Sequence, residues 1–466
     1  MEWNKLLTVK TITEREKYPY GQGYRISPFE EDYQNLVSSF AFRRLQDKTQ
    51  VFPLDKSDFV RTRLTHSIET SSIAHQLGYA FFTKLSEIKY DENGNIIENK
   101  YGIDEDIRNN TRQILRCAGL LHDLGNPPFG HFGEVVIGDF FKKFFDKNNP
   151  KYTEQLSEEE RLDFEYFNGN AQNIRLIAKY EQEEGLNFTL PTIHTLLKYP
   201  YGSKEAKNKS KRDKFGFFQS EKDFINNIAS ELGTLGNDKI SRHPLTLILE
   251  AADDIAYLTA DLEDAYEKCL FSKSELTNFC KNEIEKLYKE HNCSKLDQKT
   301  KPIELLDSLF DPSDPDETLE FGAWIKKARY WLSYVVQYQF EKKYQEIMDG
   351  SYNEDLFYYT NHFITIKAFR NAMKKFVYSH QSILRTELSA KTILTSLLEK
   401  FANAVLTHDK EGSSDYDKKL YNLMPENCKN NSDNSTYSRL LTVTDFISGM
   451  TDSYAKSLYQ ELNGII

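Results

Sequence analysis

The chain has 466 residues, of which 39% are hydrophobic and 13% aromatic, and it carries a formal net charge of −11. This composition provides enough apolar side chains for a core and argues against an intrinsically disordered chain. No apolar stretch approaches the roughly 18 residues of a membrane helix. The excess of acidic over basic residues argues against a uniformly basic surface that binds nucleic-acid backbones.

The cysteine pattern and the N-terminal residues indicate the cellular compartment of the protein. Five cysteines occur, an odd number, and none forms a CxxC pair. This spacing excludes a zinc ribbon and fits reduced thiols. The N-terminal residues are charged and lack the apolar segment of a secretory signal. We therefore expect a cytoplasmic protein with no membrane contact.

Patterns typical of helices dominate the chain. Between Thr111 and His122, apolar residues recur three and four positions apart, as on one side of a helix. Further helices are predicted over Thr65–Leu77, over Leu245–Glu267, and over Ser438–Leu462, which Gly449 interrupts. The run Asn187–Pro191 is expected to form a small hairpin at most, and strands do not alternate with helices as in a parallel sheet. The predicted fold class is mainly α.

Four polar segments are expected to form surface excursions, at least in part: Lys142–Glu165, Gly202–Lys214, Asp311–Asp316 and His408–Ser438. The second of these is a basic loop in an acidic protein. None has the composition of a linker between domains. We therefore expect one large helical body over 1–466, with loop insertions.

The sharpest local feature is the pair His122-Asp123 at the end of an apolar helix. A glycine and two prolines follow within five residues and end the helix. A buried carboxylate at this position must be paired, hydrated or metal-bound. Taken alone, the pair also fits a core histidine beside a surface aspartate.

Two other segments place polar side chains on helix faces. Arg63 and His66 lie one helical turn apart. Asp253, Tyr257 and Asp261 follow one another at intervals of four residues on an otherwise apolar helix, so one polar stripe runs along it. A half-exposed helix with a solvated acidic face is the alternative for this stripe.

The order His66, His122-Asp123, Asp253 resembles the metal-binding signature of the HD-domain phosphohydrolases. The strings FRRLQDKTQVFPL, RTRLTHSIE, GLLHDLGNPPFGHFGE, GNAQNIRL, LEAADDIAYLTADLEDA and ISGMTD resemble the bacterial deoxyguanosinetriphosphate triphosphohydrolase family. The resemblance implies an HD-domain helical fold with helical and loop insertions. Its HD-type metal-binding core would span 60–265, and a C-terminal helical region, 266–466, would complete the nucleotide pocket and the oligomer contacts.

The resemblance also implies a metal site and a catalytic pair. The ligands would be His66, His122, Asp123 and Asp253, a donor set that suits Mg²⁺ or Mn²⁺, with Co²⁺ or Ni²⁺ as further candidates. His131 would transfer a proton, and Glu134 would orient it. Whether His131 acts on the water or on the departing oxygen stays open, and a His–Glu contact that caps the helix is the alternative.

Substrate contacts are implied in the same way. Phosphate contacts would come from Arg63, Asn170, Lys198 and Lys214, and sugar contacts from Gln50, Tyr257 and Asp261. Both lysines could equally be solvated, and Tyr257 could be an ordinary core residue. If the ring of Tyr257 packs against the deoxyribose, it leaves no room for a 2′-hydroxyl.

The predicted reaction is the metal-dependent hydrolysis of deoxynucleoside triphosphates, with dGTP as the expected substrate, to deoxynucleoside and inorganic tripolyphosphate. One alternative is an HD-type phosphohydrolase or phosphodiesterase with another substrate. Another is a nucleotide-sensing or single-stranded DNA-binding HD protein. The resemblance further implies a homo-oligomer, a hexamer or tetramer. The basic loop is a candidate accessory site for a nucleotide effector or for single-stranded DNA.

Overall fold

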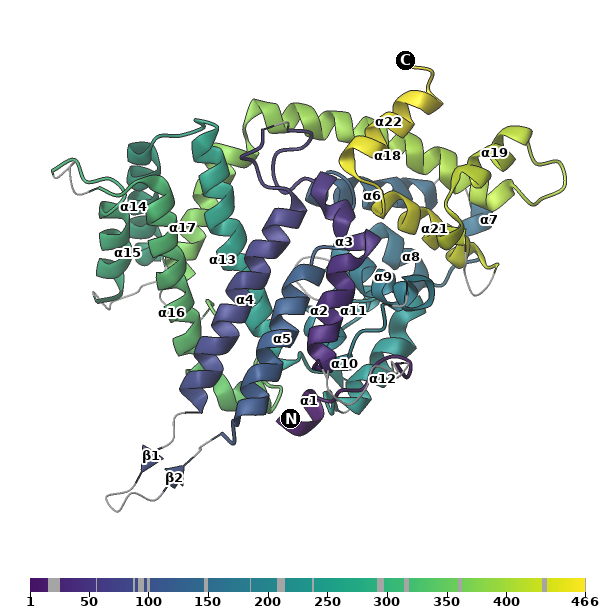
Figure 1. The fold of residues 1–466 in the computed structure, drawn as a ribbon. Helices are drawn as coiled ribbons and strands as arrows, with labels where there is room; N and C mark the ends of the chain where they lie inside the picture. Colours follow the sequence, from purple (N-terminus) through teal and green to yellow (C-terminus); the bar gives the residue numbers. More distant parts are fainter. Residues whose placement is uncertain are drawn as a thin grey trace.

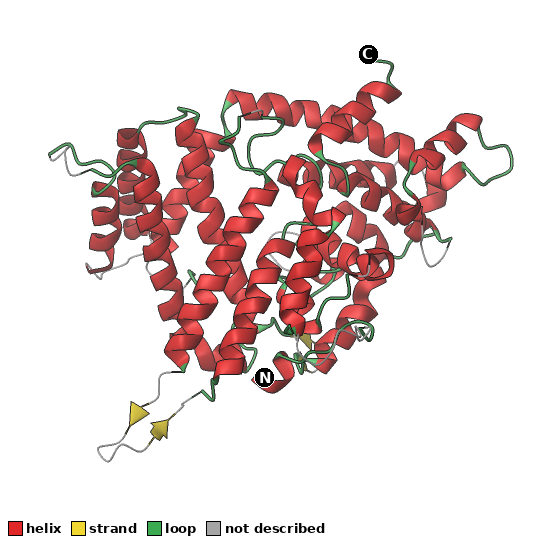
Figure 2. Cartoon of the chain, in the orientation of Figure 1, coloured by secondary structure: helices red, strands yellow, loops and turns green. Residues whose placement is uncertain are grey.

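The computed structural model describes residues 1–15, 26–55, 57–86, 89–90, 96–98, 101–145, 150–184, 186–207, 214–236, 239–290, 297–313, 318–358, 363–429 and 434–465. Helices account for nearly all the regular structure of these residues, which confirms the mainly α class (Figure 2). Within the described part of the chain, no helix is long and apolar enough to cross a membrane.

The N-terminal half contains α1 (Trp3–Leu6), α2 (Pro28–Ser38), α3 (Phe40–Arg44), the 3₁₀-helix η1 (Leu45–Asp47), α4 (Arg63–Leu85), α5 (Glu105–Leu121), α6 (Gly130–Lys143), α7 (Pro150–Thr153), α8 (Glu158–Glu165), α9 (Gly169–Glu184), α10 (Leu190–Thr195), α11 (Ser203–Lys207), the 3₁₀-helix η3 (Gln219–Glu221) and α12 (Lys222–Glu231). The C-terminal half contains α13 (Pro244–Glu267), α14 (Lys273–Glu290), α15 (Asp297–Asp307), α16 (Phe321–Met348), α17 (Phe363–Met373), the π-helix η5 (Lys374–Tyr378), α18 (Gln381–Thr407), α19 (Asp415–Leu423), α20 (Glu426–Lys429), α21 (Thr436–Ser448) and α22 (Asp452–Leu462).

Strands are few and short. β1 (Lys89–Tyr90) pairs with β2 (Ile96–Glu98), and β3 (Leu235–Gly236) pairs with β4 (Lys239–Ile240), both antiparallel. The run Asn187–Pro191, expected to form a small hairpin at most, forms no hairpin. Thr189 instead forms a single bridge with Thr11, and α10 begins at the next residue, with a proline in its first turn.

Local sequence explains where the site-bearing helices begin. A capping box between Thr62 and Thr65 starts α4, and Asp104 caps α5 by accepting a hydrogen bond from the N–H of Ile107. His243 caps α13. The predicted break at Gly449 is confirmed because α21 ends at Ser448 and α22 begins three residues after the glycine.

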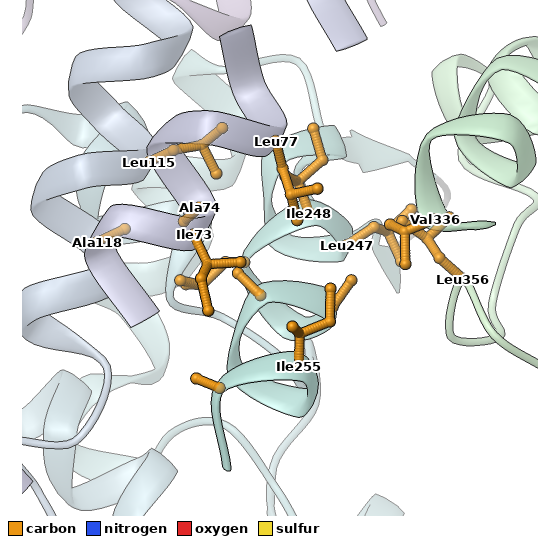
Figure 3. Packing of buried hydrophobic residues seen from close by; sticks show 14 of the residues in the cluster. Ile73, Ala74, Leu77, Leu115, Ala118, Leu247, Ile248, Ile255, Val336 and Leu356 are labelled. Atoms are coloured by element: carbon orange, nitrogen blue, oxygen red, sulfur yellow. The ribbon is translucent and has the colours of Figure 1, made fainter. Parts of the chain in front are cut away.

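The larger hydrophobic cluster lies between α4, α5, α13 and α16, which run beside one another (Figure 1). Figure 3 shows Ile73, Ala74 and Leu77 of α4 beside Leu115 and Ala118 of α5 and Ile248 and Ile255 of α13, with Leu247 turned toward Val336 and Leu356. Each apolar face therefore buries itself against a neighbouring helix, which is the main source of stability in such a fold.

A second hydrophobic cluster lies between α6, α8, α18, α21 and α22. It includes Phe164 and Phe144, so the segment Lys142–Glu165 is a surface excursion only in part. Residues 146–149, 208–213, 314–317 and 430–433 of the four predicted excursions, and Cys293, lie outside the described residues. α5 packs in the larger cluster and α6, the next helix, packs in the second, so residues 122–129 connect the two.

Candidate metal centre and active site

Three side chains from three helices meet at one point. His66 extends from the first turn of α4, His122 is the residue that ends α5, and Asp253 lies within α13. Their ligating atoms all lie within 4.8 Å of one another. The Oδ1 atom of Asp253 is 3.2 Å from Nε2 of His66 and 3.5 Å from Nε2 of His122.

A glycine allows α5 to approach α4 this closely. A Cβ atom at Gly119 would lie 2.5 Å from Cα of Ser71, a separation that real Cβ atoms do not reach. Gly119 also accepts a hydrogen bond from Nδ1 of His122 at 2.8 Å. This bond leaves the other ring nitrogen, Nε2, directed at the cluster with its lone pair available.

The donor set fits a divalent cation. Among the described residues, Nε2 of His122 is buried and has no hydrogen-bond partner. Burial lowers the pKa of His122, but the charges of Asp123 and Asp253 outweigh this effect and raise the pKa to about 9. A field that attracts a proton so strongly would equally attract a metal ion, whose ligands must give up their protons.

Asp123 stands beside this cluster rather than fully within it. Its Oδ1 atom is 3.6 Å from Nε2 of His122, and its Oδ2 atom is 3.9 Å from Nε2 of His66. Oδ2 accepts a hydrogen bond from Nη1 of Arg63 at 2.6 Å, and Oδ1 accepts one from the amide of Asn126. Burial raises the pKa of Asp123, but Arg63 and the two histidines lower it to about 2. Arg63, predicted to contact phosphate, thus holds a predicted metal ligand.

His131 and Glu134 form a pair at the start of α6. The Nδ1–H of His131 donates to Oε2 of Glu134 at 2.5 Å. The side chain of His131 is 76% exposed, whereas Glu134 is buried and also accepts a hydrogen bond from the N–H of Gly169. Burial raises the pKa of Glu134, but the contacts with His131, Lys214 and Gly169 together lower it. Glu134 is therefore a carboxylate that orients an accessible imidazole.

The remaining predicted phosphate contacts have charged or polar neighbours. Nζ of Lys198 is 3.5 Å from Oε1 of Glu250 and 3.9 Å from Oδ2 of Asp253. Lys214 is close enough to Glu134 to lower its pKa. Asn170 lies at the start of α9, directly after the glycine that contacts Glu134.

The predicted sugar contacts bring in two residues that the sequence did not indicate. The hydroxyl of Tyr257 accepts a hydrogen bond from Nε of Arg370 at 2.9 Å. The hydroxyl of Tyr378 donates to Oδ2 of Asp261 at 3.5 Å. Arg370 and Tyr378 lie more than a hundred positions beyond their partners, outside the strings that carried the resemblance, so no local signal identified them.

Two of the predicted sugar contacts keep unused hydrogen-bonding groups, and Arg370 forms an independent ion pair. Among the described residues, the buried atoms Oε1 of Gln50 and Oδ1 of Asp261 have no hydrogen-bond partner. Burial raises the pKa of Asp261 well above its usual value. Nη2 of Arg370 also donates to Asp254 at 3.0 Å, which fixes the arginine beside Tyr257.

Comparison with known proteins agrees with this geometry. Residues 63–258 match the HD domain family, and residues 361–461 match the phosphohydrolase-associated domain family. A deoxyguanosinetriphosphate triphosphohydrolase-like protein of Listeria innocua is 37% identical, with all of both chains covered. A protein of the same description from Synechocystis is 32% identical, again with all of both chains covered. A deoxyguanosinetriphosphate triphosphohydrolase of Yersinia pestis is 29% identical over 93% of each chain.

These matches confirm the resemblance and make the chain a hydrolase of the HD superfamily with a histidine–aspartate cluster that could bind a metal. The chain belongs to the deoxyguanosinetriphosphate triphosphohydrolase-like family of HD-domain phosphohydrolases.

Proposed function

We propose that this chain hydrolyses deoxynucleoside triphosphates, with dGTP as its principal substrate, to deoxynucleoside and inorganic tripolyphosphate. The observation that carries the proposal is the position of Arg63. Its Nη1 atom bonds Asp123 at 2.6 Å, and its Nη2 atom lies 2.8 Å from where a Cβ of Gly130 would stand. One guanidinium therefore lies between the metal cluster and the helix start that carries His131.

His66, His122 and Asp253, with Asp123 beside them, would hold Mn²⁺ or Mg²⁺, or else Co²⁺ or Ni²⁺. Such an ion polarises a phosphate oxygen and lowers the pKa of a bound water. The chain itself supplies the proton transfer. Glu134 keeps a proton on Nδ1 of His131, so Nε2 is the atom that accepts or delivers a proton during hydrolysis.

The polar groups around the cluster would bind the substrate. A triphosphate carries several negative charges, and Arg63, Lys198 and Lys214 supply cations near the two catalytic elements, with Asn170 as a neutral donor. Gln50 and Asp261 retain buried oxygens that a sugar hydroxyl could satisfy. The contacts of Arg370 and Tyr378 support the proposal that the region 266–466 completes the nucleotide pocket.

The proposal extends to the assembly. We expect a homo-oligomer, a hexamer or a tetramer, in the cytoplasm. The basic segment 202–214 is the proposed accessory site for a nucleotide effector or for single-stranded DNA. Gel shifts with single-stranded DNA at low salt test this part, and absence of binding there removes the DNA alternative.

A substrate panel tests the reaction. The full chain is incubated with each of the four dNTPs and GTP, singly and mixed, with Mn²⁺ or Mg²⁺, and the products are separated by ion exchange. Tripolyphosphate from dGTP supports the proposal, and dGMP with pyrophosphate contradicts it. His66→Ala should abolish turnover. The matched control is His75→Ala, which removes another histidine of α4 that lies beside Arg112 instead of the cluster.

A further inference from the structure

The segment that begins α6 and carries His131 and Glu134 contacts one turn near the C-terminal end of the chain. This turn, 448–452, joins α21 to α22. Its last residue, Asp452, is 1% exposed. Oδ1 of Asp452 accepts a hydrogen bond from the N–H of Phe129 at 2.9 Å, and Oδ2 accepts from both the N–H (3.1 Å) and the hydroxyl of Thr49.

The bond to Phe129 stabilises an unfavourable backbone conformation. Phe129 has a φ of 62°, in the left-handed region that residues with a Cβ rarely adopt. It precedes α6, and its own side chain makes no capping bond. His131 and Glu134 follow in the first five residues of that helix. The direction of α6, and thus of the His131 ring, depends on the conformation that Asp452 stabilises.

The same turn is connected through a buried lysine to the segments that hold the candidate metal ligands. Lys48 is 3% exposed, and its Nζ atom donates to the carbonyl oxygens of Asn126 at 2.7 Å and of Ser448 at 2.6 Å. Asn126 is the residue that bonds Asp123. The carbonyl oxygen of Lys48 accepts a hydrogen bond from the N–H of Arg63 at 2.9 Å. The loop after α5 and the first residue of α4 are thus tied to the C-terminal turn.

We infer that Asp452 is a positioning residue which, together with Lys48, aligns the His131–Glu134 pair with the His66–His122–Asp253 cluster. The inference rests on the proposed function, because it gives Asp452 a role exerted through His131. Its hydrogen bonds, among the described residues, go to Phe129 and Thr49 rather than to any candidate ligand.

The test compares Asp452→Ala and Asp452→Asn with Asp415→Ala. Asp415 is a matched control because it is also the first residue of a helix, but its side chain is 81% exposed and pairs only with Lys419 in the described structure. A misplacement near 1 Å costs about 100-fold in rate, so we expect Asp452→Ala to lower kcat by about 10- to 100-fold with KM changed by less than about threefold. Asp452→Asn keeps an oxygen that can accept the hydrogen bond from Phe129, so its kcat should decrease less than that of Asp452→Ala. Asp415→Ala should have the kcat and KM of the wild type.

Two further measurements separate positioning from general damage, with every variant first checked for a wild-type unfolding midpoint. In a His131→Gln background, Asp452→Ala should lower kcat by less than about twofold, because residues that act as one unit are not additive. If Asp452→Ala lowers kcat in the His131→Gln background as much as it does in the wild-type background, the inference is overturned. Hydrogen exchange of the peptide 126–134 should accelerate in Asp452→Ala and stay unchanged in Asp415→Ala.

The exchange measurement does not depend on turnover. If the wild type hydrolyses no dNTP while exchange still accelerates in Asp452→Ala, the proposed function fails and the alignment of α6 by Asp452 stands. Unchanged exchange overturns the inference whatever the wild-type activity, and so does an unchanged kcat in an active enzyme.

Discussion

Arg63 and Asp123 are 60 positions apart in the chain and form a buried ion pair, with 2.6 Å between Nη1 and Oδ2. Their side chains are only 8% and 12% exposed. The pair fixes the carboxylate of Asp123, with Oδ2 3.9 Å from Nε2 of His66 and Oδ1 3.6 Å from Nε2 of His122.

Removing the arginine should destabilise the fold. Arg63→Gln leaves the carboxylate of Asp123 buried without its cation, and breaking such a pair costs about 3 kcal/mol of the free energy of unfolding. Urea denaturation measures the loss. Arg161→Gln is the control, because Arg161 pairs with Glu165 one turn away on a more exposed surface and should cost less than about 0.5 kcal/mol. Equal losses for the two variants would contradict a special role for the buried pair.

Metal binding should stabilise the wild type and not a ligand variant. At a concentration of about 100 times its Kd, Mn²⁺ should add about 2.7 kcal/mol to the free energy of unfolding, and a chelator should remove this gain. Asp253→Ala should lose most of it, because Asp253 is the carboxylate that faces both histidines. Asp223→Ala, which removes an exposed carboxylate of α12, should keep the gain. Thermal unfolding with and without Mn²⁺ decides between the outcomes.

Sugar discrimination should depend on the ring of Tyr257. Arg370 bonds the hydroxyl of Tyr257 and is itself fixed by Asp254, so the ring has a set position. Tyr257→Ala should raise the kcat/KM of GTP relative to dGTP by roughly tenfold or more, since steric exclusion of one small group is worth about 1–3 kcal/mol. Tyr257→Phe keeps the ring and should keep the preference for dGTP. If the alanine variant discriminates as well as the wild type, the ring does not select the sugar.

Stability at acid pH should depend on His243. Burial lowers the pKa of His243 to about 4, and its Nδ1 atom accepts the capping hydrogen bond from the N–H of Leu245. The unfolded chain binds a proton there near pH 6.5, so the unfolded state gains protons first as the pH falls. The free energy of unfolding therefore decreases between about pH 6.5 and pH 4, by about 1.4 kcal/mol per pH unit from this group.

An asparagine at this position keeps the cap without titrating. His243→Asn should therefore reduce the loss of stability between pH 6.5 and 4.5 by about 2 kcal/mol relative to the wild type. His380→Asn is the matched control, because His380 also caps a helix, α18, but is exposed. Chemical denaturation at several pH values measures both. A wild-type pH profile in His243→Asn would show that this histidine is not the titrating group.

The amino-acid sequence by itself determined the helices and the position of several site residues along them. The periodicity before His122 and the glycine and prolines after Asp123 define the end of α5, because capping and helix termination depend on a few neighbouring residues. The interval from Asp253 to Tyr257 likewise places both on one face of α13.

Only the tertiary structure decided which of these residues meet. The sequence does not show that Arg63 pairs with Asp123 or that Arg370 contacts Tyr257. It also does not show that Asp452 supports the backbone of Phe129, 323 positions earlier. Such contacts depend on how apolar helix faces pack, and packing places side chains together without leaving any local periodicity. The members of the candidate metal cluster could thus be named residue by residue, whereas the groups that hold them became visible only once the helices were assembled.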